Sequence, residues 1–195
     1  MDGTLVNSIA AVSKAWGDFA VEHGLDPVAV LDHAHGRPTI DTITKFMPER
    51  TDDERAALVD ELLENEISRT VGIVEIPGAR ALMDAIFASG IPVALVTSAT
   101  EALMRSRMAA AGLVVPDVIV CDGDVTNGKP APDAYLRAAE LLGIPASECV
   151  ILEDSAAGIA AAQAAGVAGT ILVGETDPTD QNLFAIPDLR GLEIS

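Results

Sequence analysis

The segment Met1-Asp2-Gly3-Thr4-Leu5-Val6 opens the chain and places a carboxylate, a glycine and a threonine before the apolar residues Leu5 and Val6. Taken alone, such a segment predicts no more than an Asp-Gly turn. Three later segments give it weight, because each places polar or charged side chains at the end of a short apolar run or in the loop after one. They are Thr97-Ser98-Ala99-Thr100, Asn127-Gly128-Lys129-Pro130 and Leu152-Glu153-Asp154-Ser155.

Short runs of apolar residues predict buried β-strands, because a strand that is covered on both faces shows no alternation of polar and apolar side chains. The runs span 92–97, 117–121, 148–153 and 168–173. Helical patterns separate them, around 82–87, 103–111, 135–142 and 159–165. This alternation predicts an α/β fold, a doubly wound parallel sheet whose ligand site lies at the carboxyl ends of the strands.

Residues 10–76 show a different pattern, with amphipathic helical segments and no convincing strand. The helical segments lie around 12–23, 27–35, 40–46 and 52–70. Pro77 and Gly78 then mark the return to the alternating pattern. We therefore predict a core domain formed by residues 1–9 and 77–195, with residues 10–76 inserted as a small helical subdomain in which Trp16 and Phe19 pack.

The composition excludes several classes of function. The chain has 12 Lys and Arg against 30 Asp and Glu, a net charge of −18, and nucleic-acid surfaces need clustered basic residues. No apolar run reaches the ~18 residues of a membrane span, and the first residues lack signal-peptide character. Cys121 and Cys149 have no metal-ligand spacing, so we expect buried, reduced thiols. We expect a cytoplasmic protein without a nucleic-acid, membrane or obligate protein partner.

Ser98 and Lys129 are candidate contacts for a phosphoryl group. A hydroxyl at the end of a strand, followed by free amides such as that of Ala99 at a helix start, can bind such an anion. Alternatively, Ser98 or Thr100 only caps the next helix. Lys129 lies between a glycine and a proline, so the loop presents it from a restricted base, whereas an ordinary surface lysine is mobile.

Glu153 and Asp154 end a buried apolar strand, where two carboxylates are costly unless they are paired or bound to a metal. Oxygen ligands of this kind suit Mg²⁺. The alternative is a helix N-terminus that the acidic groups stabilise and that Ser155 caps.

Together these segments resemble the four motifs of the haloacid dehalogenase-like (HAD) superfamily, over essentially the whole chain. The closest resemblance is to its β-phosphoglucomutase-like and sugar-phosphate phosphatase branch, in which a small helical cap closes over the active site. The resemblance implies that Asp2 acts as general acid and base and that Ser98 and Lys129 stabilise the transferred phosphoryl group. The phosphate- or substrate-binding set that it implies is Gly3, Thr4, Ser98, Ala99, Lys129 and Arg37, and the Mg²⁺ ligands are Asp2, Glu153 and Asp154.

Arg37 belongs to the segment expected to form the cap. In relatives that act on phosphorylated sugars and polyols, cap residues of this kind set substrate choice, so the resemblance makes Arg37 a substrate contact. The alternative is a salt bridge with Asp41, four residues further along a helical pattern.

One residue of the family motif has no counterpart. The motif begins with an apolar strand and Asp-x-Asp-Gly-Thr-Leu, and Met1 stands at x, so the nucleophilic aspartate and the central strand are expected to be missing. About six buried apolar residues at ~1.5–3 kcal/mol each amount to ~9–18 kcal/mol, as much as the ~5–15 kcal/mol net stability of a domain. We expect an unstable or inactive chain whose two neighbouring strands face each other across a gap with unpaired backbone groups.

The predicted function is Mg²⁺-dependent hydrolysis of a small phosphorylated metabolite, a sugar or polyol phosphate, through an aspartyl-phosphate intermediate. A β-phosphoglucomutase-like phosphomutase and a non-catalytic, phosphate-binding relative are the alternatives. Haloacid dehalogenases proper carry a non-carboxylate residue at the position of Asp2 and need no metal. Asp2 and Asp154 therefore favour phosphoryl transfer.

Overall fold

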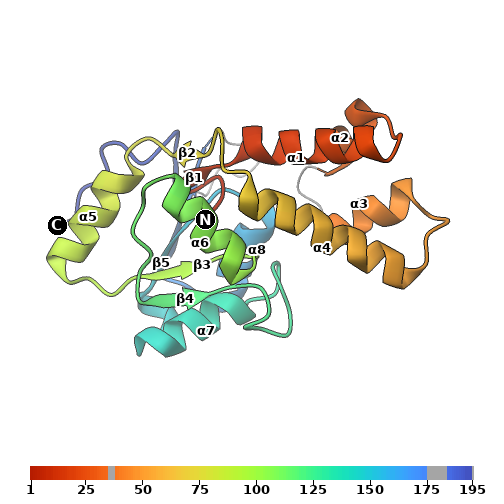
Figure 1. The fold of residues 1–195 in the computed structure, drawn as a ribbon. Helices are drawn as coiled ribbons and strands as arrows, with labels where there is room; N and C mark the ends of the chain where they lie inside the picture. The colour runs from red at the N-terminus through yellow and green to blue at the C-terminus, as the bar shows by residue number, and fades with distance from the viewer. Residues whose placement is uncertain (35–37, 175–183, 195) are drawn as a thin grey trace. The chain divides into compact units, whose positions relative to one another are not determined.

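The computed structural model describes residues 1–34, 38–174 and 184–194 (Figure 1). It divides into two compact units, which we call unit 1 (Met1–Asn7 and Val74–Ser195) and unit 2 (Ser8–Ile73). The strands β1 (Val6–Asn7) and β2 (Val74–Glu75) pair antiparallel within unit 1. The sequence predicts no strand before residue 77. Strand β2 is not predicted because a strand of two residues shows no periodicity.

Unit 1 contains the strands that the apolar runs predict, and its parallel pairing confirms the α/β fold class. In the order of the chain they are β3 (Ala94–Val96), β4 (Val118–Val120), β5 (Val150–Glu153), β6 (Gly169–Val173) and the additional short β7 (Phe184–Ile186). They form two parallel sheets, with strand orders β3-β4 and β5-β6-β7. The expected single sheet is thus divided between β3 and β5.

A cavity of about 390 Å³ borders both β3 and β5. Within the part of the chain that the structure describes, β3 has a strand partner only on its β4 side, and β5 only on its β6 side. Strand β3 is short because Pro92 lacks the amide hydrogen that a sheet ladder needs.

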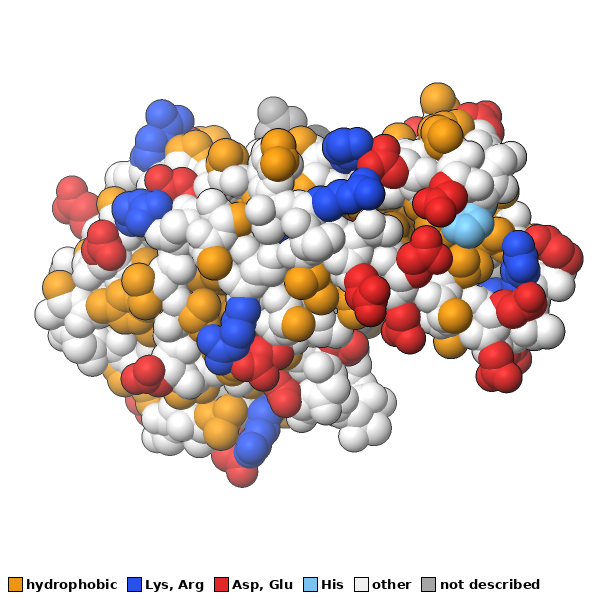
Figure 2. Space-filling model, viewed as in Figure 1, with side chains coloured by type: hydrophobic (Ala, Val, Ile, Leu, Met, Phe, Trp, Pro, Cys, Tyr) orange, Lys and Arg blue, Asp and Glu red, His pale blue; other side chains and the backbone are white. Residues whose placement is uncertain are grey.

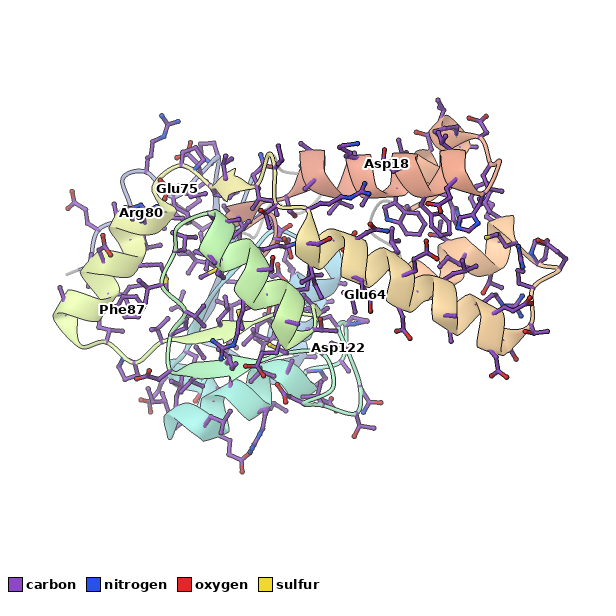
Figure 3. All side chains as sticks on the ribbon, viewed as in Figure 1. Asp18, Glu64, Glu75, Arg80, Phe87 and Asp122 are labelled. Carbon is purple, nitrogen blue, oxygen red and sulfur yellow. The ribbon has the colours of Figure 1, made fainter. Side chains whose placement is uncertain are left out.

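The helices of unit 1 follow their strands at the predicted places. They are α5 (Ala79–Ser89), α6 (Glu101–Ala110), α7 (Asp133–Leu142), the 3₁₀ helix η1 (Ala146–Glu148) and α8 (Ala156–Ala165). Helix α5 starts after Gly78, whose φ is +91°, and a Cβ there would collide with the backbone of Leu189. Arg80 of α5 contacts Glu75 and donates to the Ala111 carbonyl at 3.1 Å (Figure 3). These contacts fix α5 to the end of α6.

Unit 2 consists of helices at the predicted ranges. They are α1 (Ile9–Glu22), α2 (Pro27–Ala34), α3 (Thr39–Phe46) and α4 (Asp52–Ser68). Trp16 and Phe19 pack in one apolar cluster with Ile43 and Leu62, which confirms their predicted structural role. The Thr51 hydroxyl accepts a hydrogen bond from the Glu54 amide, and the Glu54 carboxylate accepts one from the Thr51 amide, so α4 begins with a complete capping box.

The acidic surface and the state of the two cysteines mostly agree with what the sequence predicts. Acidic side chains are scattered over the visible face (Figure 2). No described helix is long and apolar enough to span a membrane. Both cysteines are free thiols, and Cys121 is buried as predicted, whereas Cys149 is only partly buried.

Candidate active site

Asp2 lies in a tight turn at the start of unit 1. The Gly3 amide donates to the Val6 carbonyl at 2.8 Å, and the Val6 amide donates to the Met1 carbonyl at 3.1 Å. Gly3 has a φ of +71°, and a Cβ at this position would overlap the carboxylate of Asp154. Glycine is therefore required both by the turn and by the close approach of a second acidic residue.

The carboxylate of Asp2 forms an ion pair with Arg107 of α6, with 3.0 Å between Oδ2 and Nη1. The Arg107 side chain is only 8% exposed, against 33% for Asp2. Arg107 shares the buried face of α6 with Leu103, Met104 and Met108. The sequence analysis missed this residue, although a cation at apolar helical spacing is a signal that could have revealed it.

Lys129 and Glu153 form the most buried ion pair of the site. The Nζ–Oε1 distance is 2.5 Å, and the two side chains are 12% and 4% exposed. Tyr135 of α7, which the sequence analysis also missed, donates to the same Glu153 oxygen at 3.2 Å, and the Lys129 Nζ lies 5.0 Å from the centre of its ring. Burial alone would raise the pKa of Glu153, but the Lys129 ammonium overcomes this effect and holds the pKa at about 2.

The other groups around Glu153 come from its own turn. The amide of Asp154 donates to Oε2 at 2.6 Å, and a Cβ on Gly158 would overlap this side chain. Ser155 caps α8, because its hydroxyl accepts from the Gly158 amide at 3.1 Å. Glu153 is thus the paired carboxylate of the two that end β5, and the capping role considered for Ser155 is confirmed.

Asp154 is held by the turn at the start of the chain. Its Oδ1 accepts a hydrogen bond of 2.9 Å from the Thr4 hydroxyl. The residue as a whole is exposed, whereas its carboxylate is enclosed by Gly3, Thr4 and Glu153. Loss of hydration, followed by the interaction with Glu153, raises the pKa of Asp154 to about 6.

The predicted metal ligands do not form a cluster of carboxylates. Among the described residues, no group of three or more His, Cys, Asp and Glu side chains is placed to hold a metal ion. Asp2 pairs with Arg107 and Glu153 with Lys129, whereas the carboxylate of Asp154 is crowded by a like charge and its pKa is raised. A nearby cation would lower the pKa of Asp154 again. The carboxylate oxygens of Asp154 therefore fit a divalent ion as ligands. The ligand set Asp2, Glu153 and Asp154 stays a prediction.

Ser98 lies at the carboxyl end of β3 and is exposed. The next helix is capped by Thr100, whose hydroxyl accepts from the Leu103 amide at 3.4 Å. The capping alternative therefore applies to Thr100, and Ser98 is accessible to a ligand. The Ala99 amide donates to Thr97 Oγ1 at 3.1 Å.

The remaining predicted phosphate contacts are used within the protein or lie outside the described residues. The Gly3 amide and the Thr4 amide both close the first turn, and the Thr4 hydroxyl holds Asp154. Arg37 lies outside the described residues. Phosphate binding by this set stays a prediction.

The amino group of Met1 lies among the charged residues of the site. Burial, and after it the positive charge of Lys129, lower the pKa of this group, while Asp2, Glu153 and Asp154 act in the opposite direction.

Comparison with known proteins identifies the family of this chain. The chain matches the model of haloacid dehalogenase-like hydrolases over residues 1–166. It is 43% identical over 166 residues to Hexitol phosphatase A of Escherichia coli (strain K12). The matched region covers 85% of this chain and 77% of that protein. It is 34% identical over 179 residues to Glycerol-1-phosphate phosphohydrolase 1 of Saccharomyces cerevisiae, covering 85% and 69%.

A solved structure of β-phosphoglucomutase from Clostridium difficile has the same fold. Its TM-score is 0.81 at 19% identity, over 98% of this chain and 90% of that one. This likeness supports the fold, while the family match rests on the sequence. The chain belongs to the haloacid dehalogenase-like hydrolase family.

Proposed function

We propose that this site belongs to a Mg²⁺-dependent phosphatase that hydrolyses a sugar or polyol monophosphate. The observation that carries the proposal is the set of contacts that joins the turn of Asp2 and Gly3 to Asp154 and joins Asp154 to the buried Glu153–Lys129 pair. The similarity to Hexitol phosphatase A supports the substrate class.

In the proposed reaction, the carboxylate of an aspartate held beside Asp2 attacks the phosphorus atom of the substrate. The bond from phosphorus to the ester oxygen breaks, and protonated Asp2 gives its proton to the leaving alcohol. Ionised Asp2 then takes a proton from a water molecule, which attacks the aspartyl phosphate. Inorganic phosphate leaves, and the aspartate is regenerated. In the family motif that the first segment resembles, this aspartate stands two positions before the residue that Asp2 matches.

The neighbouring side chains prepare this chemistry. Arg107 fixes the position of Asp2, and Thr4 fixes that of Asp154. Lys129, held by Glu153, supplies positive charge to the phosphoryl oxygens as negative charge builds up. Asp154 would hold a Mg²⁺ ion, which would supply further positive charge for the same oxygens.

The test compares this chain with a version extended by an apolar strand that ends in aspartate. We expect Mg²⁺-dependent phosphate release from hexitol phosphates or glycerol phosphate in the extended form. Asp2→Asn should lower kcat by ~10²–10⁴, the range of general acid–base catalysis. Asp84→Asn, on the exposed surface of α5, is the matched control and should leave the rate unchanged.

Two results would count against the proposal. An extended chain that folds but releases no phosphate from any substrate in the panel would remove the hydrolase assignment. Interconversion of glucose 1-phosphate and glucose 6-phosphate without phosphate release would assign a phosphomutase instead.

A further inference from the structure

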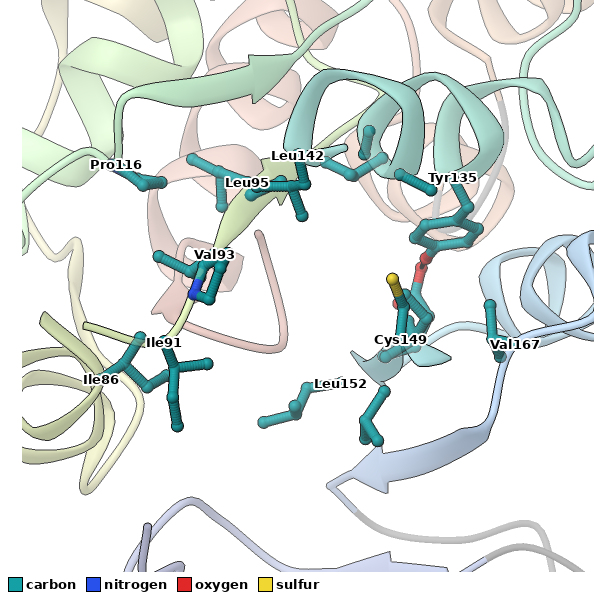
Figure 4. Close-up of a pocket in the computed structure, with 18 of the residues that line it drawn as sticks. Ile86, Ile91, Val93, Leu95, Pro116, Tyr135, Leu142, Cys149, Leu152 and Val167 are labelled. Carbon is teal, nitrogen blue, oxygen red and sulfur yellow. Dashed lines mark hydrogen bonds between the residues drawn. The ribbon is translucent and has the colours of Figure 1, made fainter. Parts of the chain in front are cut away.

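Tyr135 contacts both members of the buried ion pair between Lys129 and Glu153, and it uses two different parts of its side chain to do so. Its hydroxyl donates to Glu153 Oε1 at 3.2 Å, and the centre of its ring lies 5.0 Å from the Lys129 Nζ. Figure 4 shows Tyr135 projecting from α7 toward the side of the cavity on which Cys149 and Leu152 lie. The three side chains form one group, although they come from α7, the loop before it and the end of β5.

The surroundings of Tyr135 fix its side chain. The residue is 5% exposed and packs in a cluster with Ala161 and Ala162 of α8. Burial, and after it the negative charge of Glu153, raise the pKa of Tyr135 above its ordinary value of 10. The hydroxyl therefore keeps its proton and acts toward the carboxylate as a donor.

The carboxylate of Glu153 is held on both of its oxygens. Oε1 accepts from the Lys129 ammonium and from the Tyr135 hydroxyl. Oε2 accepts from the amide of Asp154 at 2.6 Å and from that of Ser155 at 3.3 Å. A carboxylate has about four lone-pair sites, so these donors fix the plane of the group. Without the Tyr135 hydroxyl, Oε1 would keep only Lys129 and a long contact of 3.4 Å with the Ser155 hydroxyl.

The ammonium of Lys129 ends a flexible four-carbon stem, so a single ion pair does not fix its direction. Among the residues that the structure describes, Glu153 is its only hydrogen-bond partner. An ammonium group has three N–H donors, so donors remain for an anionic ligand. The face of an aromatic ring attracts an ammonium within about 6 Å of the ring centre. The ring of Tyr135 therefore gives Lys129 a second contact that leaves these donors available.

We propose that Tyr135 is a positioning residue of this site. Its hydroxyl fixes Glu153 and its ring limits the movement of Lys129, so that the ammonium is held in one place and still presents N–H donors. Tyr135 acts through these two side chains and does not touch the reacting atoms. The use of Lys129 on a phosphoryl group rests on the proposed function, whereas the fixing of its ammonium by Tyr135 does not.

The composition of the chain makes this proposal directly observable. The chain has one tyrosine, Tyr135, and three lysines, Lys14, Lys45 and Lys129. Resonance Raman spectroscopy of the single tyrosine should show a hydroxyl that donates to a carboxylate. NMR of ¹⁵N-labelled lysine measures the mobility of each ammonium, and we expect that of Lys129 to be the most restricted. Lys14, whose side chain is 66% exposed, is the internal reference.

Two variants of Tyr135 separate the roles of its hydroxyl and its ring. Tyr135→Phe keeps the ring and should make the Lys129 ammonium more mobile, because Glu153 loses one donor. Tyr135→Leu removes both contacts and should give the larger increase. The mobility of Lys14 should be the same in all three proteins. These measurements use the chain of 195 residues and the extended form of the phosphatase test.

The kinetic experiment uses the form that releases phosphate in the phosphatase test. Tyr135→Phe should lower kcat about tenfold, because a hydrogen bond to a charged group is lost. KM should change by less than about twofold, since the charge of Lys129 counts most in the transition state. In a Lys129→Met background, Tyr135→Phe should cause no further loss, because the effect passes through Lys129.

The matched control is Leu113→Val, a small truncation of a buried residue of unit 1 that is 7% exposed. It should lower the melting temperature and leave both kcat and the mobility of Lys129 unchanged at temperatures where the protein is folded. Equal loosening of Lys129 by Leu113→Val and Tyr135→Phe would overturn the proposal, because the effect would then be general destabilisation.

Two further results would overturn it. They are a Lys129 ammonium as mobile as that of Lys14 in the parent chain, and a kcat that Tyr135→Phe leaves unchanged. If Tyr135→Phe loosens Lys129 as expected but no form of the chain releases phosphate, the positioning role of Tyr135 stands and the phosphatase assignment fails.

Discussion

The two units of the chain bury their residues in different ways. Unit 2 has one apolar cluster around Trp16, Phe19 and Leu62. Unit 1 also buries apolar residues such as Met104 and Met108, but it has in addition a cavity between its sheets and the buried charges of Arg107 and Glu153. The difference teaches that unit 2 is organised for packing, whereas unit 1 holds charged groups in place at some cost in stability.

The largest loss of stability is expected when the buried carboxylate of Glu153 in unit 1 loses its partner Lys129. Lys129→Met should lower the free energy of unfolding by about 3–5 kcal/mol, because Glu153 stays buried as an unpaired carboxylate. The double variant Lys129→Met/Glu153→Gln should recover most of this loss. Urea denaturation with hydrogen exchange of unit 1 peptides measures both.

Lowering the pH should reduce the difference in free energy of unfolding between Lys129→Met and the parent chain. The folded-state pKa of Glu153, about 2, lies below its ordinary value of 4.5. Its contribution to stability is therefore complete above pH 4.5 and is lost as the pH falls toward 2. A loss in Lys129→Met that stays constant down to pH 2 would contradict the assignment of Glu153 as the affected group.

The same truncation in the two units tests the comparison directly. Leu62 is 1% exposed in the core of unit 2, so Leu62→Ala should cost about 3 kcal/mol. Leu95 is 5% exposed but already borders the cavity, so Leu95→Ala should cost only about 1–2 kcal/mol because fewer contacts are lost. Equal losses in urea denaturation would show that the cavity of unit 1 does not loosen its core.

A gain in stability is expected at Asp154. Its folded-state pKa of about 6 lies above the ordinary 3.8, so the residue lowers stability as the pH rises from 3.8 through 6. After allowance for its exposure, Asp154→Asn should raise the free energy of unfolding at pH 8 by about 1 kcal/mol. At pH 3.5 the two proteins should be equal. A variant that is less stable at pH 8 would contradict the argument.

The smallest effect concerns a single helix of unit 2. Thr51→Ala removes the side-chain half of the capping box of α4 and should cost about 0.5–1 kcal/mol. Hydrogen exchange should increase in α4 and stay unchanged in the peptides of unit 1. Thr51→Ser, which keeps the hydroxyl, is the matched control and should behave as the parent chain.

The sequence by itself determined the order of the elements. Apolar runs such as 148–153 gave β5, and glycines such as Gly143 and Gly166 end helices in the left-handed conformation that other residues avoid. The resemblance to the family motifs marked Asp2, Lys129 and Asp154, and the cost of two carboxylates at the end of an apolar strand also marked Glu153 and Asp154. Periodicity and turn chemistry are local properties, and local properties can be read along a chain.

Only the tertiary structure decided which groups face each other. It paired Asp2 with Arg107, 105 positions apart by their numbering, placed Tyr135 against Glu153, and assigned Lys129 to Glu153. It also divided the sheet between β3 and β5 and left the cavity there. Such contacts depend on the packing of segments distant in sequence and on the free energy of burying a charge. Neither is a property of any single stretch of residues.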